Sequence, residues 1–419
     1  MIGYLVGLVS LAAIALAGRH LSRSWAAPAV LLPTGWFAYA GMALLIIPEP
    51  QQVVPGLLWI VVSCVAFQAG SVLATTWPMP GDESPATMPS AGHFPGLGGI
   101  VLILGGASVG ALILESRTLG FSPGDLVSVP MLARMAARSR SVFTFGDAEQ
   151  GGAMRLLLAL SYTGTLFAGM AFRVAATWRQ RLAALLPLVT ILLLGAMHGT
   201  RMGILFGGNF WVAAFVATAL VGTRDRPRVA TRLFMVTGGL AAVLLAALST
   251  AVQFLRYYVG NEKTAALIIA DPFGFLPAFS QWFQSNGVRT SDLTGGFYMF
   301  ERLGRALGST YPAVPVTDLG FTSSNVYTVF RAMIEDFGTL GSLVLTVAIG
   351  CLGSHAFRAV LAGRERWIAV LALTYAFVFT SPALSPFSYS GPLMGAVLFM
   401  AYVAMIPRMP ARVMHMARA

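Results

Sequence analysis

The densest group of polar side chains lies between Ser323 and Gly341, directly before an apolar segment long enough to cross a bilayer. The run contains an amide, a phenol, a cation and two carboxylates, which belong to Asn325, Tyr327, Arg331, Glu335 and Asp336. Polar groups crowded at a membrane boundary are costly and usually functional. We expect Arg331 to contact an anion, and Asp336 to pair with it or to act as a general base towards a hydroxyl group. Glu335 suits the first turn of a helix, where the helix dipole stabilises a carboxylate.

Two further arginines are predicted at the same boundary. Arg201 lies between two apolar segments that have almost no loop between them, and Arg256 ends the next apolar segment beside Tyr257. Such an arginine either reaches the surface from a helix end or faces a cavity and binds phosphate. We expect the second arrangement, in which these arginines converge with the cation of the polar run. His198 precedes Arg201 by three residues, either as a packed boundary residue or as part of the substrate site.

The composition places these groups in a membrane protein. Hydrophobic residues make up 57% of the chain and charged residues 10%, whereas soluble domains carry about 25% charged residues. The net charge of +11 comes from arginine, since Lys263 is the only lysine. This bias reflects either genome composition or the recognition of phosphate and carboxylate by guanidinium groups. Cys64 and Cys351 lie in apolar runs, which argues against a disulfide framework.

Eleven apolar segments are predicted to span the bilayer as helices, which makes residues 1–419 one all-α integral membrane domain. They are 2–18, 27–47, 54–75, 97–115, 152–172, 182–198, 202–222, 233–253, 334–356, 367–383 and 391–407. Loop arginines follow the odd-numbered spans, so the positive-inside rule places those loops in the cytoplasm. The N-terminus is then predicted outside and the C-terminus inside.

Two longer segments, 116–151 and 254–333, are predicted as loops on the outer, periplasmic face. The arginines of these loops that we expect to bind substrate are Arg134, Arg138, Arg289 and Arg302. The first two are four residues apart, which places them on one face of a helix. Within the second loop, Asp271–Phe283 is rich in aromatic residues and is predicted to lie as a helix on the membrane surface.

The polar run resembles the signature of a known family. Asn325-Val-Tyr327-Thr328, followed by Asp336-Phe337-Gly338, resembles the "NVYT…DFG" signature of oligosaccharide repeat-unit polymerases, the Wzy-type O-antigen and exopolysaccharide polymerases. Gly199-Thr-Arg201 is similar to the "GSR" element of that family, with Thr in place of Ser. The residues that match family positions are Arg201, Asn325, Tyr327, Arg331 and Asp336. Ala332-Met333 departs from the pattern, because aromatic residues are expected after the signature arginine.

The resemblance implies a GT-C-like membrane glycosyltransferase of the bacterial inner membrane. It would transfer a growing glycan from undecaprenyl pyrophosphate to a hydroxyl of another lipid-linked repeat unit on the periplasmic face. Arginines would neutralise the leaving pyrophosphate, and no metal or other cofactor is expected. The expected partners are the lipid-linked donor and acceptor glycans, the lipid bilayer and a polysaccharide chain-length regulator, with no nucleic acid.

Three other functions compete with this interpretation. An O-antigen ligase would use the same donor with a different acceptor, and the sequence does not separate it from a polymerase. A transporter or flippase usually has repeated halves and broken helices near the midplane, and no internal repeat is evident here. A polyprenyl-phosphate-sugar transferase typically has acidic residues in its first outer loop, where this chain has only Glu49.

Overall fold

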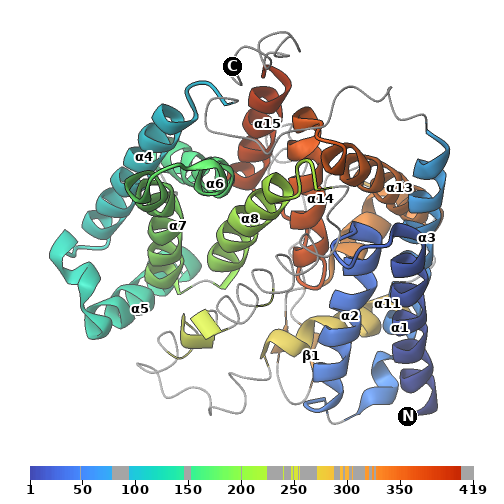
Figure 1. The fold of residues 1–419 in the computed structure, drawn as a ribbon. Coiled ribbons are helices and arrows are strands. Elements are labelled where there is room, and N and C mark those ends of the chain that lie inside the picture. The colour runs from blue at the N-terminus through green and yellow to red at the C-terminus, as the bar shows by residue number, and fades with distance from the viewer. Residues whose placement is uncertain are drawn as a thin grey trace, which may run out of the picture.

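The protein is a bundle of helices in the computed structural model (Figure 1). The structure describes residues 1–47, 49–77, 94–145, 152–199, 201–223, 271–286 and 327–406, with shorter pieces within 239–254 and 293–324. The helices are α1 (Ile2–Ser22), α2 (Pro28–Leu44), α3 (Val54–Thr76), α4 (Leu97–Thr118), α5 (Val129–Phe145), α6 (Gly152–Val174), α7 (Trp178–His198), α8 (Arg201–Ala219), α11 (Phe275–Asn286), α13 (Val329–Leu361), α14 (Ile368–Thr380) and α15 (Ser390–Ala404). Short 3-10 helices are η1 (Pro50–Val53), η3 (Pro123–Val127), η4 (Asp271–Gly274) and η5 (Glu365–Trp367).

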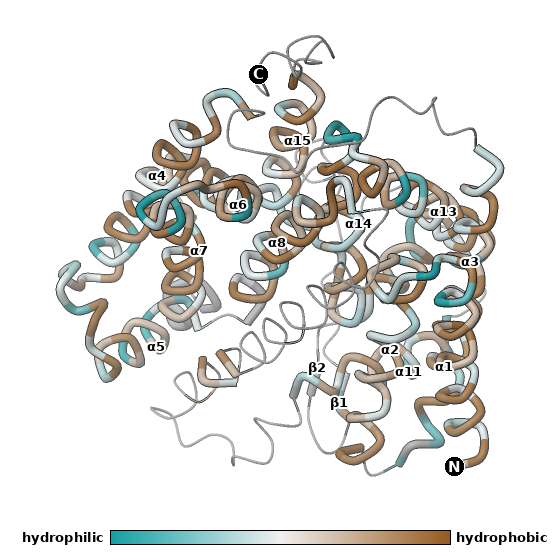
Figure 2. Tube along the Cα trace, viewed as in Figure 1, coloured by the Kyte–Doolittle hydropathy of each residue, from teal (hydrophilic) through white to brown (hydrophobic). Residues whose placement is uncertain are grey.

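The apolar segments of the sequence form helices, as predicted. Each predicted span has a helical counterpart among the described residues except 233–253, most of which lies outside them. Six helices in the described part are long and apolar enough to cross a membrane, and three shorter apolar helices accompany them. Apolar residues run along most of these helices (Figure 2). The chain is therefore a multi-pass membrane protein.

The helices α3 and α13 are packed backbone to backbone at two glycines. A Cβ atom on Gly70 would collide with the carbonyl oxygen of Val347, and one on Gly350 would collide with that of Phe67. Small residues at such crossings let membrane helices approach closely, since no hydrophobic driving force acts between helices within lipid. The contact fixes α13, which carries the polar run of the sequence, against α3.

A kink divides α13 shortly after its start. Gly338 has φ 71° and ψ 177°, whereas the residues on both sides are helical. That conformation is accessible essentially to glycine alone, so the kink depends on the glycine at this position. The predicted span 334–356 is thus a short helix ending at the kink, followed by a long apolar helix.

The prediction for Asp271–Phe283 was right about the helix and wrong about its surroundings. The segment forms η4 and α11, but most side chains of Phe275–Ser280 and the side chain of Trp282 are buried within the protein rather than exposed to lipid. The hydroxyl of Ser280 accepts a hydrogen bond from the backbone N–H of Gly56 at 3.1 Å and donates one to the carbonyl oxygen of Gln52 at 2.7 Å. These contacts seat α11 on the start of α3, because the aromatic residues find protein partners there.

Candidate functional site

The start of α13 is fixed to the end of α14. Thr328 occupies the capping position before the first helical residue, Val329, although its hydroxyl makes no hydrogen bond. The backbone N–H of Val329 donates to the carbonyl oxygen of Ser381 at 3.1 Å. One of the N–H groups that a helix start leaves unpaired is thereby satisfied by tertiary structure.

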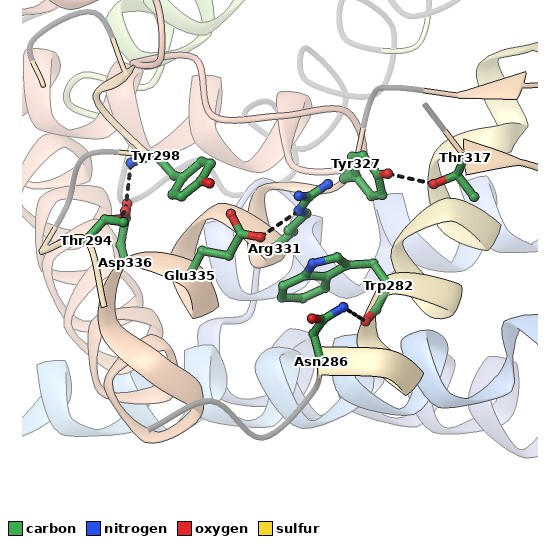
Figure 3. Close-up of polar contacts among 9 residues, drawn as sticks. All are labelled: Trp282, Asn286, Thr294, Tyr298, Thr317, Tyr327, Arg331, Glu335 and Asp336. Atoms are coloured by element: carbon green, nitrogen blue, oxygen red, sulfur yellow. Dashed lines mark hydrogen bonds and ion pairs between the residues drawn. The ribbon is translucent and has the colours of Figure 1, made fainter. Parts of the chain in front are cut away.

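Arg331 is held in this first turn by one carboxylate and two aromatic rings (Figure 3). Its Nε donates to Oε1 of Glu335 at 3.1 Å, one helical turn away. The guanidinium carbon lies 3.9 Å from the ring centroid of Tyr327 and 5.2 Å from that of Trp282. Cation–π contacts of this kind stabilise a cation more strongly when water is excluded. The exposed fraction is only 8% for Arg331 and 6% for Glu335, so their charges meet in a dry setting.

The pair of charges leaves two hydrogen-bonding atoms unpaired. Nη1 of Arg331 and Oε2 of Glu335 are both buried and have no hydrogen-bond partner. A buried donor or acceptor without a partner costs about 1–3 kcal/mol, and more when it is charged. Native proteins contain few such groups, and each one requires an explanation. Within the described residues, Gln68 also has two such atoms, but only here do two of them belong to the partners of one ion pair.

The two rings come from segments outside the α13 helix. The hydroxyl of Tyr327 and Oγ1 of Thr317 are 2.6 Å apart and share a hydrogen bond. Thr317 belongs to a two-residue antiparallel ladder of β1 (Thr317–Asp318) and β2 (Ser323–Ser324). Trp282 lies on α11, and its carbonyl oxygen accepts a hydrogen bond from the side chain of Asn286 at 3.1 Å.

Asp336 faces a different segment and is fully engaged there. Its Oδ1 accepts hydrogen bonds from the hydroxyl of Thr294 and, at 2.7 Å, from the backbone N–H of Tyr298. Its Oδ2 accepts from the backbone N–H of Met299 at 2.7 Å, and its carbonyl oxygen accepts from the N–H of Gly295 at 3.0 Å. This carboxylate is 1% exposed. Its contacts favour a role in fixing Thr294, Gly295, Tyr298 and Met299 to α13.

The structure brings together part of the predicted site. Tyr327 and Arg331 are in contact, and Asp336 lies one turn further along α13. The carboxylate bound to Arg331 is Glu335, for which the sequence suggested only a helix-dipole role. Trp282 was not predicted to join the site. The sequence showed that Trp282 belongs to a segment rich in aromatic residues, but this pattern did not indicate which helix Trp282 would contact.

A second polar pair lies at the junction of α7 and α8. Nε2 of His198, the last residue of α7, is 2.9 Å from Oε1 of Glu115 in the last turn of α4. Glu115 is 1% exposed, and a buried carboxylate in a membrane helix is expected to have a partner. The predicted position of His198 beside the start of α8 is confirmed, whereas its carboxylate partner was not foreseen. Arg201 is the first residue of α8, but its side chain lies outside the described atoms.

The other predicted arginines are placed in part. Arg134 and Arg138 lie on α5 and are both exposed, as expected of residues four apart on one face of a helix. Nη1 of Arg134 contacts the sulfur of Met131 at 3.8 Å. The predicted site residues that fall outside the described residues are Arg256, Arg289, Arg302 and Asn325.

Within the described residues, no group of three or more His, Cys, Asp or Glu side chains is placed to hold a metal ion. No family model, curated protein or solved structure matches this chain.

Proposed function

We propose that this protein is a membrane glycosyltransferase that polymerises undecaprenyl-pyrophosphate-linked oligosaccharide repeat units on the periplasmic face of the bacterial inner membrane. The glycan on one lipid carrier is transferred to a hydroxyl of a second lipid-linked unit, and undecaprenyl pyrophosphate leaves. The proposal includes the eleven-span topology, a GT-C-like fold, an external N-terminus and a cytoplasmic C-terminus.

The observation that carries the proposal is the Arg331 site at the start of α13. The family-like residues Tyr327, Arg331 and Asp336 share one turn-and-helix unit, and two hydrogen-bonding atoms of the ion pair await a partner. Their place at the head of a bundle of apolar helices suits an enzyme whose substrate is anchored in the bilayer. A polar ligand could reach the site while its lipid tail stays in the membrane.

The leaving pyrophosphate requires cations that stabilise the charge developing in the transition state. We assign this role to Arg201 and Arg256, which the sequence places at the ends of neighbouring spans on the same side. Arg331 contributes less to it, because Glu335 already balances its charge. Asp336 receives a positioning role, since both of its oxygens accept hydrogen bonds.

The test is a chromosomal deletion, followed by gel analysis of surface polysaccharide and extraction of lipid-linked intermediates. Single repeat units accumulating on undecaprenyl pyrophosphate, accessible from the periplasm, are the expected result. Intact long polymer left on the lipid carrier would instead identify a ligase. Units trapped on the cytoplasmic side would identify a flippase, and either result would overturn the proposal.

Complementation then tests the assigned arginines. Arg201→Ala and Arg256→Ala are expected to abolish polymer formation at normal protein levels, because the leaving group would lose its counter-charge. Exposed Arg179 on α7, which is not among the candidate site residues, is the control arginine for overall charge, and Arg179→Ala is expected to have the smaller effect. Wild-type polymer from a well-expressed Arg201→Ala variant would exclude the pyrophosphate role.

A further inference from the structure

The free atoms of the Arg331–Glu335 pair define the kind of ligand that fits them. One is a donor, Nη1 of Arg331, and the other is an acceptor, Oε2 of Glu335. A hydroxyl group both donates and accepts, whereas phosphate oxygens at neutral pH chiefly accept. A sugar hydroxyl, or two neighbouring ones, would satisfy both atoms. A pyrophosphate would satisfy the arginine and leave the carboxylate unpaired.

The charge of the site leads to the same conclusion. Nε of Arg331 and Oε1 of Glu335 are 3.1 Å apart, so the pair is close to neutral as seen from a ligand. A bound pyrophosphate would bring like charge next to a carboxylate that is 6% exposed. Coulomb repulsion is poorly screened in such a dry place. The site therefore favours a neutral ligand over an anion.

Aromatic side chains complete the lining. The buried rings of Trp282 and Tyr327 confine the guanidinium, and Tyr298 lies on the side of Glu335 (Figure 3). Small-molecule sites typically combine an aromatic lining with a few polar groups that fix orientation. Tyr298 and Asn286, at the edge of the cluster, are partly buried.

We infer that Trp282, Tyr327, Arg331 and Glu335 form a binding site for a neutral sugar residue, which is the acceptor sugar in the proposed reaction. Naming this sugar the acceptor rests on the proposed function, whereas the binding of a neutral sugar does not. The donor sugar carries the pyrophosphate on its reacting carbon and needs cations nearby. The acceptor hydroxyl lies at the non-reducing end, up to a repeat unit away from its own pyrophosphate, and a neutral aromatic site suits it.

The experiment measures binding to the full-length protein in lipid nanodiscs with two probes. One is the oligosaccharide released by partial acid hydrolysis of the native polysaccharide, which lacks lipid and pyrophosphate, and the other is inorganic pyrophosphate. Arg331→Gln and Glu335→Gln are expected to weaken oligosaccharide binding at least tenfold and to leave pyrophosphate binding no weaker. Glu49→Gln, at an exposed carboxylate, is the control and should bind both probes as the wild type does.

Two results would overturn the inference. One is loss of pyrophosphate binding in Arg331→Gln while the oligosaccharide still binds normally, and the other is a wild-type protein that does not bind the oligosaccharide. If single variants fail to fold, the double variant Arg331→Met with Glu335→Leu removes both charges together and avoids leaving one unpaired. Wild-type oligosaccharide affinity in that variant would also overturn it.

These binding results are independent of the deletion phenotype. Normal polymer in the deletion strain would reject the proposed function and leave the sugar site in place. Single repeat units in the deletion strain, combined with unaltered oligosaccharide binding by the variants, would reject only the sugar site.

Discussion

An arginine lies near each end of α13, and the two differ in their hydrogen-bond partners. At the far end, Nη1 of Arg358 donates to the carbonyl oxygen of Ala74 at 2.6 Å, in the last turn of α3. The last carbonyls of a helix lack partners within the helix, and the dipole favours a cation there. At the near end, Arg331 is paired with Glu335 and its Nη1 is left unpaired.

Arg358 therefore has a structural role, whereas Arg331 has a free hydrogen-bond donor that a ligand can use. Arg358 donates a hydrogen bond to a backbone carbonyl oxygen at the end of α3, so both groups are satisfied within the protein. Arg331 is more deeply buried, yet one of its donors has no partner in the protein. Because an unpaired buried charge is costly, we expect substitutions at the two positions to affect different properties.

The largest contrast is expected between Arg331→Gln and Arg358→Gln. Losing a hydrogen bond to a charged group costs about 1.5–3 kcal/mol, which corresponds to roughly a 10- to 100-fold loss of polymer formation for Arg331→Gln. Arg358→Gln should retain polymer formation and lose only some thermal stability. Polymer length on gels and unfolding temperature in detergent measure the two effects. Equal loss of polymer in both variants would contradict the comparison.

Neighbouring carboxylates on α13 provide the next contrast. Asp336→Asn turns an amide N–H₂ towards backbone N–H donors, so the free energy of unfolding is expected to fall by about 1–3 kcal/mol. The folded fraction should still bind the oligosaccharide, unlike Glu335→Gln. Thermal unfolding and the binding assay test this in parallel. A stable Asp336→Asn protein that binds sugar and forms no polymer would instead support Asp336 as the general base.

The kink of α13 should be sensitive to a single methyl group. Gly338→Ala forces a non-glycine residue to φ 71° and ψ 177°, and such strain costs of order 1–3 kcal/mol. Gly99→Ala on α4 is the control, because a Cβ atom there meets nothing within 4 Å. That change should stabilise the helix by about 0.4–1 kcal/mol. Equal unfolding temperatures for the two variants would argue against strain at the kink.

The smallest effect concerns the helix that supplies Trp282. Ser280→Ala removes the hydroxyl that links α11 to Gly56 and Gln52. A single net hydrogen bond contributes about 1 kcal/mol to stability, so a modest drop in unfolding temperature is expected. Ser285→Ala, on the exposed side of α11, should show none. If Ser280→Ala also weakens oligosaccharide binding, α11 positions Trp282 for the ligand.

The sequence determined the membrane class and the approximate positions of most of the helices that the structure describes. The length of an apolar run is a local property, and a bilayer requires runs of about 20 residues. The predicted spans 2–18 and 182–198 therefore became the helices α1 and α7, with only their ends extended. The kink at Gly338 was not predicted, although glycine is the residue type that permits it.

Only the tertiary structure decided which polar groups meet. Spacing along a helix allowed Arg331 to reach Glu335. The preference for that partner over Asp336 depended on Tyr298 and Met299, whose backbone N–H groups bind the carboxylate of Asp336. Trp282 reaches Arg331 only because α11 is seated on α3. Such contacts join residues far apart in the chain. No local sequence pattern encodes them, because the hydrogen-bond partner of a buried polar group depends on all the segments that pack around it.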